Sequence, residues 1–193
     1  MTDDILFSRL ATLACHDLRT PLATVHGFAR ALEQAELGEP EARYVEMIAQ
    51  ASLELAELID ELALAARIEG GRYDPVLREA DSLELAGAVA ARLGETRIAV
   101  SGTGGTVLVD PDPTVRSVGR LAEAALRHGG PETVELAVAG PELRLTPVGP
   151  AAAPILLGEE LRDLGAAVAV RHLRALGATV SLEGETLVLV LPR

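Results

Sequence analysis

Apolar or small residues recur at alternating spacings of three and four along two long stretches near the start of the chain. In the first stretch they are Leu18, Leu22, Val25, Ala29 and Leu32, and in the second Val45, Ile48, Ser52, Leu55, Ile59, Leu62 and Ala66. Residues at these spacings share one face of a helix, where they form a packing seam. The pattern predicts one helix that ends near Leu37 and Gly38 and a second helix over residues 41–68.

The connection between these two helices is short, because Glu39 and Pro40 lie between a helix stop and a helix start. A short connection between long helices predicts an antiparallel hairpin. A single hairpin has too little opposing surface to bury both seams, so we expect two hairpins to form a four-helix bundle and the protein to be a homodimer. The alternative is a monomeric hairpin that packs against the C-terminal part of the chain.

A glycine-containing break over residues 69–75 predicts a domain boundary, with one domain over residues 1–72 and another over residues 73–193. Beyond the break the pattern predicts helices over residues 83–93, 110–128 and 155–176, and strands over residues 97–100, 106–109, 133–138, 142–146, 179–182 and 186–191. Residues 101–105 are expected to form a turn. Mixed strands and helices indicate a sheet with helices on one face. The predicted fold class is therefore α+β, a helical hairpin followed by a small α/β sandwich.

The composition indicates a globular protein with an aliphatic core. Of the 193 residues, 49% are hydrophobic and 2% are aromatic, and the formal net charge is −12. A nucleic-acid-binding protein usually has a basic face and stacking aromatics, so nucleic acid is not an expected partner of this acidic chain. The single cysteine, Cys15, excludes an internal disulfide and fits a reducing cytoplasm. No apolar run reaches the length of a membrane span and the N-terminus is acidic, so we expect a cytoplasmic protein without a membrane partner.

One short segment of the first predicted helix carries the clearest chemistry. His16 and Thr20 are four residues apart, so they share a helix face, and Asp17 lies beside them. This face is not the packing seam, so it is expected to point to solvent or to a partner. Pro21 donates no backbone hydrogen bond, which predicts a bent or loosened helix. On these residues alone, the favoured interpretation is a solvated histidine near a structural kink.

The sequence of residues 16–22, His-Asp-Leu-Arg-Thr-Pro-Leu, resembles the phosphoacceptor box of sensor histidine kinases at each position. The resemblance covers residues 5–70, including the second helix, and implies that His16 carries a phosphoryl group. A neutral imidazole nitrogen is nucleophilic, and Asp17 can orient the ring or act as a base. The resemblance also implies that Thr20 positions water for removing phosphate from a receiver aspartate. Arg19 is a candidate partner for phosphate or for an acidic receiver surface, and the alternative is a solvated helix arginine.

The C-terminal part resembles the ATP-binding domain of the same family in its order of elements but not in its chemistry. Ala124 stands where the family carries an Asn that holds magnesium and phosphates, and the chain contains no Asn at all. The next box lacks its adenine-recognising acid and reads Thr146-Pro147-Val148. Residues 163–168 keep one glycine of the later glycine box, where backbone must approach phosphate. The resemblance therefore implies a retained scaffold with a lost nucleotide site, and we expect no ATP cofactor.

Together these features predict a bacterial two-component protein that exchanges a phosphoryl group between His16 and receiver-domain aspartates without its own ATP chemistry. The layout is similar to that of dimeric histidine phosphotransferases. The expected partners are response regulator receiver domains, a second copy of the chain and a histidine kinase. The receiver domains would supply magnesium. The alternatives are a pseudokinase scaffold, a response-regulator phosphatase, and an ATP-dependent kinase with an atypical site.

The remaining histidines, His26, His128 and His172, are expected to be structural or surface residues, because no pair of them has metal-ligand spacing. The glycines at positions 102, 104 and 105 are expected to belong to the turn between two strands and not to a phosphate loop. We therefore expect neither a metal site nor a nucleotide loop elsewhere in the chain.

Overall fold

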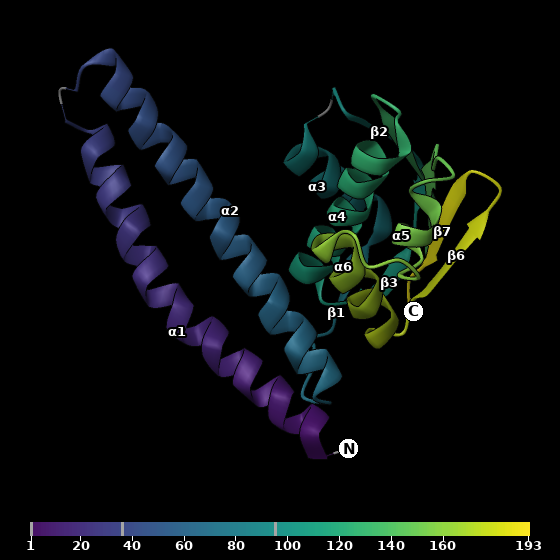
Figure 1. The fold of residues 1–193 in the computed structure, drawn as a ribbon. Helices are drawn as coiled ribbons and strands as arrows, with labels where there is room; N and C mark the ends of the chain where they lie inside the picture. Colours follow the sequence, from purple (N-terminus) through teal and green to yellow (C-terminus); the bar gives the residue numbers. More distant parts are fainter. Residues whose placement is uncertain (1, 36, 95) are drawn as a thin grey trace. The chain divides into compact units, whose positions relative to one another are not determined.

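The computed structural model describes residues 2–35, 37–94 and 96–193, with the side chains of residues 2–10, 13, 14 and 17 left undescribed. The chain forms two compact units, the first ending at Arg72 and the second beginning at Tyr73. Figure 1 shows a helical hairpin in the first unit and a mixed α/β domain in the second. The α+β class predicted from the sequence is confirmed.

The first unit consists of helix α1 (Thr2–Glu33) and helix α2 (Glu39–Glu69), packed along their length as an antiparallel pair. Pro21 lies inside α1, and the helix continues through it to Glu33. The helix ends before Leu37, where we expected it to end. The N–H of Ala35 donates to the Leu32 carbonyl over 3.0 Å, so a bond across three residues tightens the final turn and closes the helix early.

The interface inside the hairpin uses smaller residues than the predicted seams. Its buried members are Cys15, Ala29, Val45, Ala49, Ser52, Ala63 and Ala66. The seam prediction is therefore right for Ala29 on α1 and for Val45, Ser52 and Ala66 on α2. Two rows of larger seam residues remain between 41% and 52% exposed in the single hairpin, namely Leu18, Val25 and Leu32 on α1 and Ile48, Leu55 and Leu62 on α2. We call these six residues the outer rows. The buried positions between the two helices are mostly alanines, because small side chains let the helices approach closely.

The second unit is built on a five-stranded sheet with the strand order β2-β4-β5-β7-β6, in which β2 and β4 are parallel and the other neighbours antiparallel. These strands are β2 (Ile98–Gly104), β4 (Val134–Gly140), β5 (Glu142–Thr146), β6 (Thr179–Glu183) and β7 (Thr186–Val190). A separate antiparallel pair joins β1 (Arg78–Asp81) to β3 (Thr106–Val109). The helices are α3 (Ser82–Leu93), α4 (Pro111–Gly129), the short α5 (Ala153–Leu156) and α6 (Leu164–Ala175), and they lie on one side of the sheet (Figure 1).

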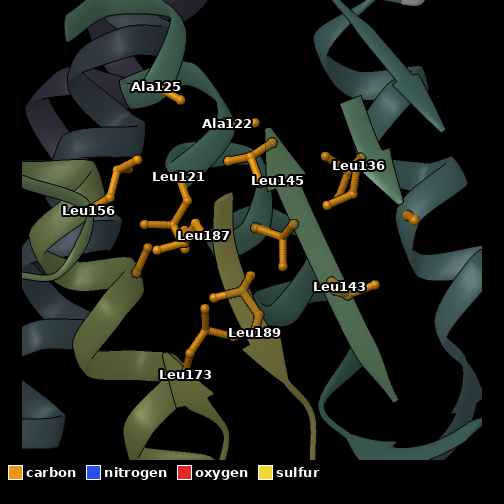
Figure 2. Close-up of a cluster of buried hydrophobic side chains, with 14 of the residues drawn as sticks. Leu121, Ala122, Ala125, Leu136, Leu143, Leu145, Leu156, Leu173, Leu187 and Leu189 are labelled. Atoms are coloured by element: carbon orange, nitrogen blue, oxygen red, sulfur yellow. The ribbon is translucent and has the colours of Figure 1, made fainter. Parts of the chain in front are cut away.

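The core between these layers is aliphatic, as the composition indicated. Figure 2 shows Leu121 of α4, Leu145 of β5 and Leu187 of β7 meeting between helix and sheet. Each of the three is at most 1% exposed. Burying a leucine side chain contributes about 1.5–3 kcal/mol, so these three residues make a large favourable contribution to folding of the unit.

Two sequence-based expectations for this unit are wrong, and one strand was missed. Residues 101–105 are not a turn, because β2 runs through Gly102 to Gly104 and pairs along its whole length with β4. A Cβ atom at Gly102 would collide with the Val138 backbone, so the glycine allows β2 to lie close to β4 at this point. The helix expected over residues 155–176 is two helices, with Asp163 capping the second. Strand β1 was not predicted at all, because its sequence Arg-Glu-Ala-Asp lacks apolar alternation.

Candidate functional site

The segment around His16 is presented outward by its buried neighbour. Cys15 is fully buried against the hairpin interior, which fixes the rotation of α1 at this point. The next residue, His16, is therefore exposed, and Thr20, one turn further on, is exposed as well. The structure thus places His16 and Thr20 on accessible surface of one helix. The side chain of Asp17 lies outside the described side chains.

Arg19 links this segment to the facing helix. Its Nε and Nη2 atoms donate to Oδ1 of Asp60 over 3.0 Å and 2.8 Å. Both side chains are about half exposed, so the pair contributes at most about 1 kcal/mol to stability. Its effect is positional, because it holds a guanidinium three residues beyond His16, on the adjoining helix face. Sequence reasoning named the segment containing Asp60 but gave this carboxylate no role, because its partner is 41 residues away in the chain.

His26 forms a cross-link inside the hairpin. Its Nδ1 atom lies 2.9 Å from the hydroxyl oxygen of Ser52, and that hydroxyl donates to the Ala49 carbonyl over 2.7 Å. A hydroxyl has one proton to donate, so the Ser52 oxygen is the acceptor from His26, and Nδ1 carries the proton. This contact agrees with the structural role expected for His26.

In the second unit, the C-terminal end of α4 and the N-terminal end of α6 converge on Asp163. Oδ1 of Asp163 accepts a hydrogen bond from the Ala166 N–H over 3.0 Å, which caps α6. Oδ2 accepts from Arg127 Nη1 over 2.8 Å and from His128 Nε2 over 3.0 Å. Burial by itself raises the pKa of the Asp163 carboxyl, but the Ala166 N–H and the contacts with His128 and Arg127 outweigh it and hold the pKa below its usual value. We call Asp163, Arg127, His128 and the Ala166 N–H the Asp163 cluster.

The residues around this helix end do not fit the phosphates of a nucleotide. Oδ1 of Asp163 already accepts the Ala166 N–H, which an anion at the N-terminus of α6 would use. The stem of Arg120 covers the neighbouring Gly165, since a Cβ atom built there would lie 3.1 Å from Arg120 Cδ. Ala124, which stands on the same helix as Arg120, is buried and offers no polar group.

A second buried polar cluster surrounds His172 of α6. Ser117 Oγ lies 2.7 Å from His172 Nδ1, and Tyr73 Oη lies 2.7 Å from His172 Nε2. The Tyr73 and His172 rings meet edge to face with centroids 5.4 Å apart. His172 is fully buried, and burial is the main cause that lowers its pKa to about 4, with Asp110 raising it and Arg116 lowering it slightly. Sequence reasoning missed Ser117 and Tyr73, which lie 55 and 99 residues from His172.

The described residues include no group of three or more His, Cys, Asp or Glu side chains that could hold a metal ion. Among the same residues, no helix is both long enough and apolar enough to cross a membrane.

Comparison with known proteins bears on both units. Residues 8–71 match the family model of the His Kinase A (phospho-acceptor) domain. The crystal structure of full-length ShkA in complex with AMPPNP aligns with 94% of this chain at 22% identity and a TM-score of 0.70, and the chain spans 44% of the length of that structure. The histidine kinase AdeS of Acinetobacter baumannii aligns over 90% of this chain and 94% of its own, at 18% identity and a TM-score of 0.55. No curated protein matches the sequence at a significant level.

Residues 8–71 therefore belong to the His Kinase A (phospho-acceptor) domain family. The chain as a whole shares the fold of histidine kinase structures, in which a phosphoacceptor hairpin is followed by a domain with the ATP-binding fold. His16 and Thr20 lie within the matched phospho-acceptor domain, whereas the Asp163 cluster lies in the ATP-binding-like domain.

Proposed function

We propose that this protein is a bacterial, cytoplasmic histidine phosphotransfer protein that exchanges phosphoryl groups with receiver domains and has no ATP-dependent autokinase activity. The observation that carries the proposal is an exposed His16 in a matched phospho-acceptor hairpin, combined with an ATP-binding-like domain whose α6 N-terminus is filled by the protein's own carboxylate. The first part supports phosphoryl transfer, and the second supports a donor other than ATP.

The transfer step needs only groups that the hairpin and a receiver supply. A lone pair on an imidazole nitrogen of His16 attacks the phosphorus of a receiver aspartyl phosphate. The N–P bond forms as the P–O bond to the aspartate breaks, and the aspartate leaves as a carboxylate. The phosphorylated ring then releases the proton on its other nitrogen, for which Asp17 is the neighbouring acceptor in the sequence. The receiver contributes the magnesium ion for its own phosphoryl chemistry.

Dimerisation is part of the proposal. The outer rows leave six large apolar side chains exposed, with successive members seven residues apart on each helix. Apolar residues at heptad spacing form the surface along which helices pack against one another in bundles. A second hairpin carrying the same rows would cover them and complete a four-helix bundle with twofold symmetry.

A phosphatase acting on phosphorylated receivers is the second candidate, and the exposed position of Thr20 one turn beyond His16 favours it. The two candidates differ in one variant. Thr20→Ala should reduce receiver dephosphorylation while labelling of His16 survives if the phosphatase activity is genuine.

The test is labelling of the full chain by a phosphorylated receiver and, separately, by labelled ATP with magnesium. We expect label from the receiver, no label from ATP, and loss of receiver labelling in His16→Ala. His26→Gln is the matched control, because it changes the other histidine of α1 while a carboxamide can still donate to Ser52, and it should be labelled normally. Labelling of the wild-type chain by ATP would contradict the absence of autokinase activity, and labelling of His16→Ala would remove His16 as the acceptor.

A further inference from the structure

The Asp163 cluster has the composition of an anion-binding site. A backbone N–H at a helix N-terminus, a guanidinium and an imidazole N–H converge on one carboxylate group, whose side chain is 7% exposed. Helix N-termini attract anions, and arginine pairs strongly with carboxylate and phosphate alike. The cluster is therefore a built site whose anion comes from the chain itself.

We propose that Asp163 is a built-in competitor for phosphate: its carboxylate fills a cradle formed by Arg127, His128 and the N-terminus of α6, and it excludes phosphoryl ligands from that cradle. This inference rests on the proposed function, because it gives the physical reason why the ATP-binding-like domain would not deliver phosphate to His16. It makes the exclusion depend mainly on one carboxylate, which a substitution can remove.

The contacts explain why a free phosphate would lose this competition. The Asp163 carboxylate is tethered at the α6 N-cap, so it reaches its donors without the entropy cost of bringing a separate anion from solution. Its lowered pKa keeps it ionised throughout the neutral range. A phosphate would therefore have to displace a permanently charged ligand and leave that charge buried beside it.

Arg120 strengthens the exclusion from the other side. Its guanidinium pairs with Glu123 over 2.8 Å, and its aliphatic stem packs over Gly165. Gly165 is the second residue of α6, so the stem covers the first turn of the helix next to the cradle. Opening the cradle by removal of Asp163 would still leave the basic end of α4 in place, with Arg127 and His128 available to a new anion.

The experiment replaces Asp163 in the full chain and titrates inorganic pyrophosphate and, separately, ADP with magnesium by calorimetry. Asp163→Ser removes the charge but keeps a hydroxyl that can cap α6. We expect pyrophosphate to bind this variant at least about tenfold more tightly than the wild-type chain. The reason is that Arg127 and His128, which donate to Asp163 in the wild type, can donate to pyrophosphate in the variant. ADP should show a gain in the same direction.

Two controls separate the cradle from a general charge effect. Glu160→Gln removes one negative charge from the same loop, where Glu160 pairs with Arg162 over 2.6 Å, and it should bind pyrophosphate as weakly as the wild type. Arg127→Gln added to Asp163→Ser should abolish the gain. If the serine variant does not fold, as checked by circular dichroism, Asp163→Asn keeps the cap and the side-chain volume, and it should also bind pyrophosphate more tightly than the wild type.

The inference is overturned by an Asp163 variant with unchanged pyrophosphate affinity, by an equal gain in Glu160→Gln, or by wild-type binding as tight as that of the variant. These results leave the proposed function standing, because they concern anion binding and not labelling. Conversely, ATP-dependent labelling of wild-type His16 would overturn the proposed function, whatever the Asp163 variants bind.

Discussion

The buried His172 should make the α/β unit acid-sensitive well above the range where carboxylates titrate. In the folded chain its two ring nitrogens lie against the hydroxyls of Ser117 and Tyr73, and its pKa is about 4. In the unfolded chain the pKa of a histidine is about 6.5. Between pH 6.5 and 4, the His172 ring is therefore protonated in the unfolded state but neutral in the folded state. Stability from this residue is fully present above pH 6.5 and is lost as the pH falls towards 4.

The magnitude follows from the two pKa values. One pKa unit corresponds to about 1.4 kcal/mol, so the full difference destabilises the unit by about 3 kcal/mol once the pH reaches 4. Between pH 7.5 and pH 5 the loss is about 2 kcal/mol, because the folded state is still almost unprotonated there. Typical domain stabilities are about 5–15 kcal/mol, so a loss of this size is measurable in a urea titration.

The assay can be made specific to the second unit. The chain has two tyrosines and no tryptophan, so in a Tyr44→Phe background Tyr73 is the single tyrosine reporter, and it lies beside His172. Urea unfolding followed by tyrosine fluorescence at pH 7.5 and pH 5 gives the loss directly. His172→Gln in this background should show a much smaller loss, since it has no ionisable group at the site.

The control for this comparison is His16→Gln, which removes an exposed histidine from the other unit and should leave the pH dependence unchanged. A His172→Gln profile that runs parallel to the wild-type profile would refute the reasoning. It would mean that the proton taken up on unfolding binds elsewhere.

Three further perturbations test other parts of the structure. Asp81→Ala removes the side chain that caps α3 through two backbone N–H groups, at 2.8 Å and 3.2 Å, and should cost about 1 kcal/mol in urea unfolding; an unchanged midpoint would show that water replaces the cap. Leu55→Glu places a charge in the outer rows and should prevent the proposed dimer, leaving a monomer in light scattering, whereas Glu57→Gln should not. Asp60→Asn weakens the hold on Arg19; it should change stability by less than about 1 kcal/mol, and the rate of phosphoryl transfer to His16 should change by more than that of the conservative variant Asp60→Glu.

The helical hairpin was predictable because the spacing of its apolar residues is regular. Which of these residues are buried between the two helices was not predictable. On α2, Ile48 and Ala49 both belong to heptad-spaced rows, and hydrophobicity favours Ile48 as the buried residue. The structure buries Ala49 and leaves Ile48 exposed. Helix separation decides this, since two helices that pack closely favour small residues between them, and this distance is not encoded in the spacing of one helix. The larger residues then need a partner that a single hairpin does not supply.

In the sheet, the elements that were missed depend on partners distant in the chain. Residues 101–105 have the composition of a turn, yet they extend β2 because Gly102 permits close approach to Val138 of β4. Strand β1 is polar and short, and it exists because it pairs with β3. Composition describes what a segment tolerates, whereas pairing between segments decides which of the tolerated conformations it adopts.

The same distinction applies to the polar residues. His16 and Thr20 could be found from the sequence because both lie in one helical turn, and their exposure follows from the burial of Cys15. Asp163 could be seen in the sequence only as a replacement within a glycine box. The structure shows what the replacement does, because Arg127 is paired with it over 2.8 Å. If the anion site is lost, removal of Asp163 should not restore anion binding. If the site is filled by Asp163, removal of this residue should restore it.

The buried polar groups of the α/β unit differ from those around His16, and this contrast bears on the proposed phosphoryl transfer. In the α/β unit, His172 and Asp163 are buried and each is engaged by two or more partners, so a new ligand would have to break bonds that are already made. In the hairpin, His16 is exposed, and the adjoining pair of Arg19 and Asp60 is half exposed and weak. A group that must accept phosphate from one protein and release it to another needs access on both occasions and little reorganisation. Of the polar sites described in this structure, the one around His16 has that property.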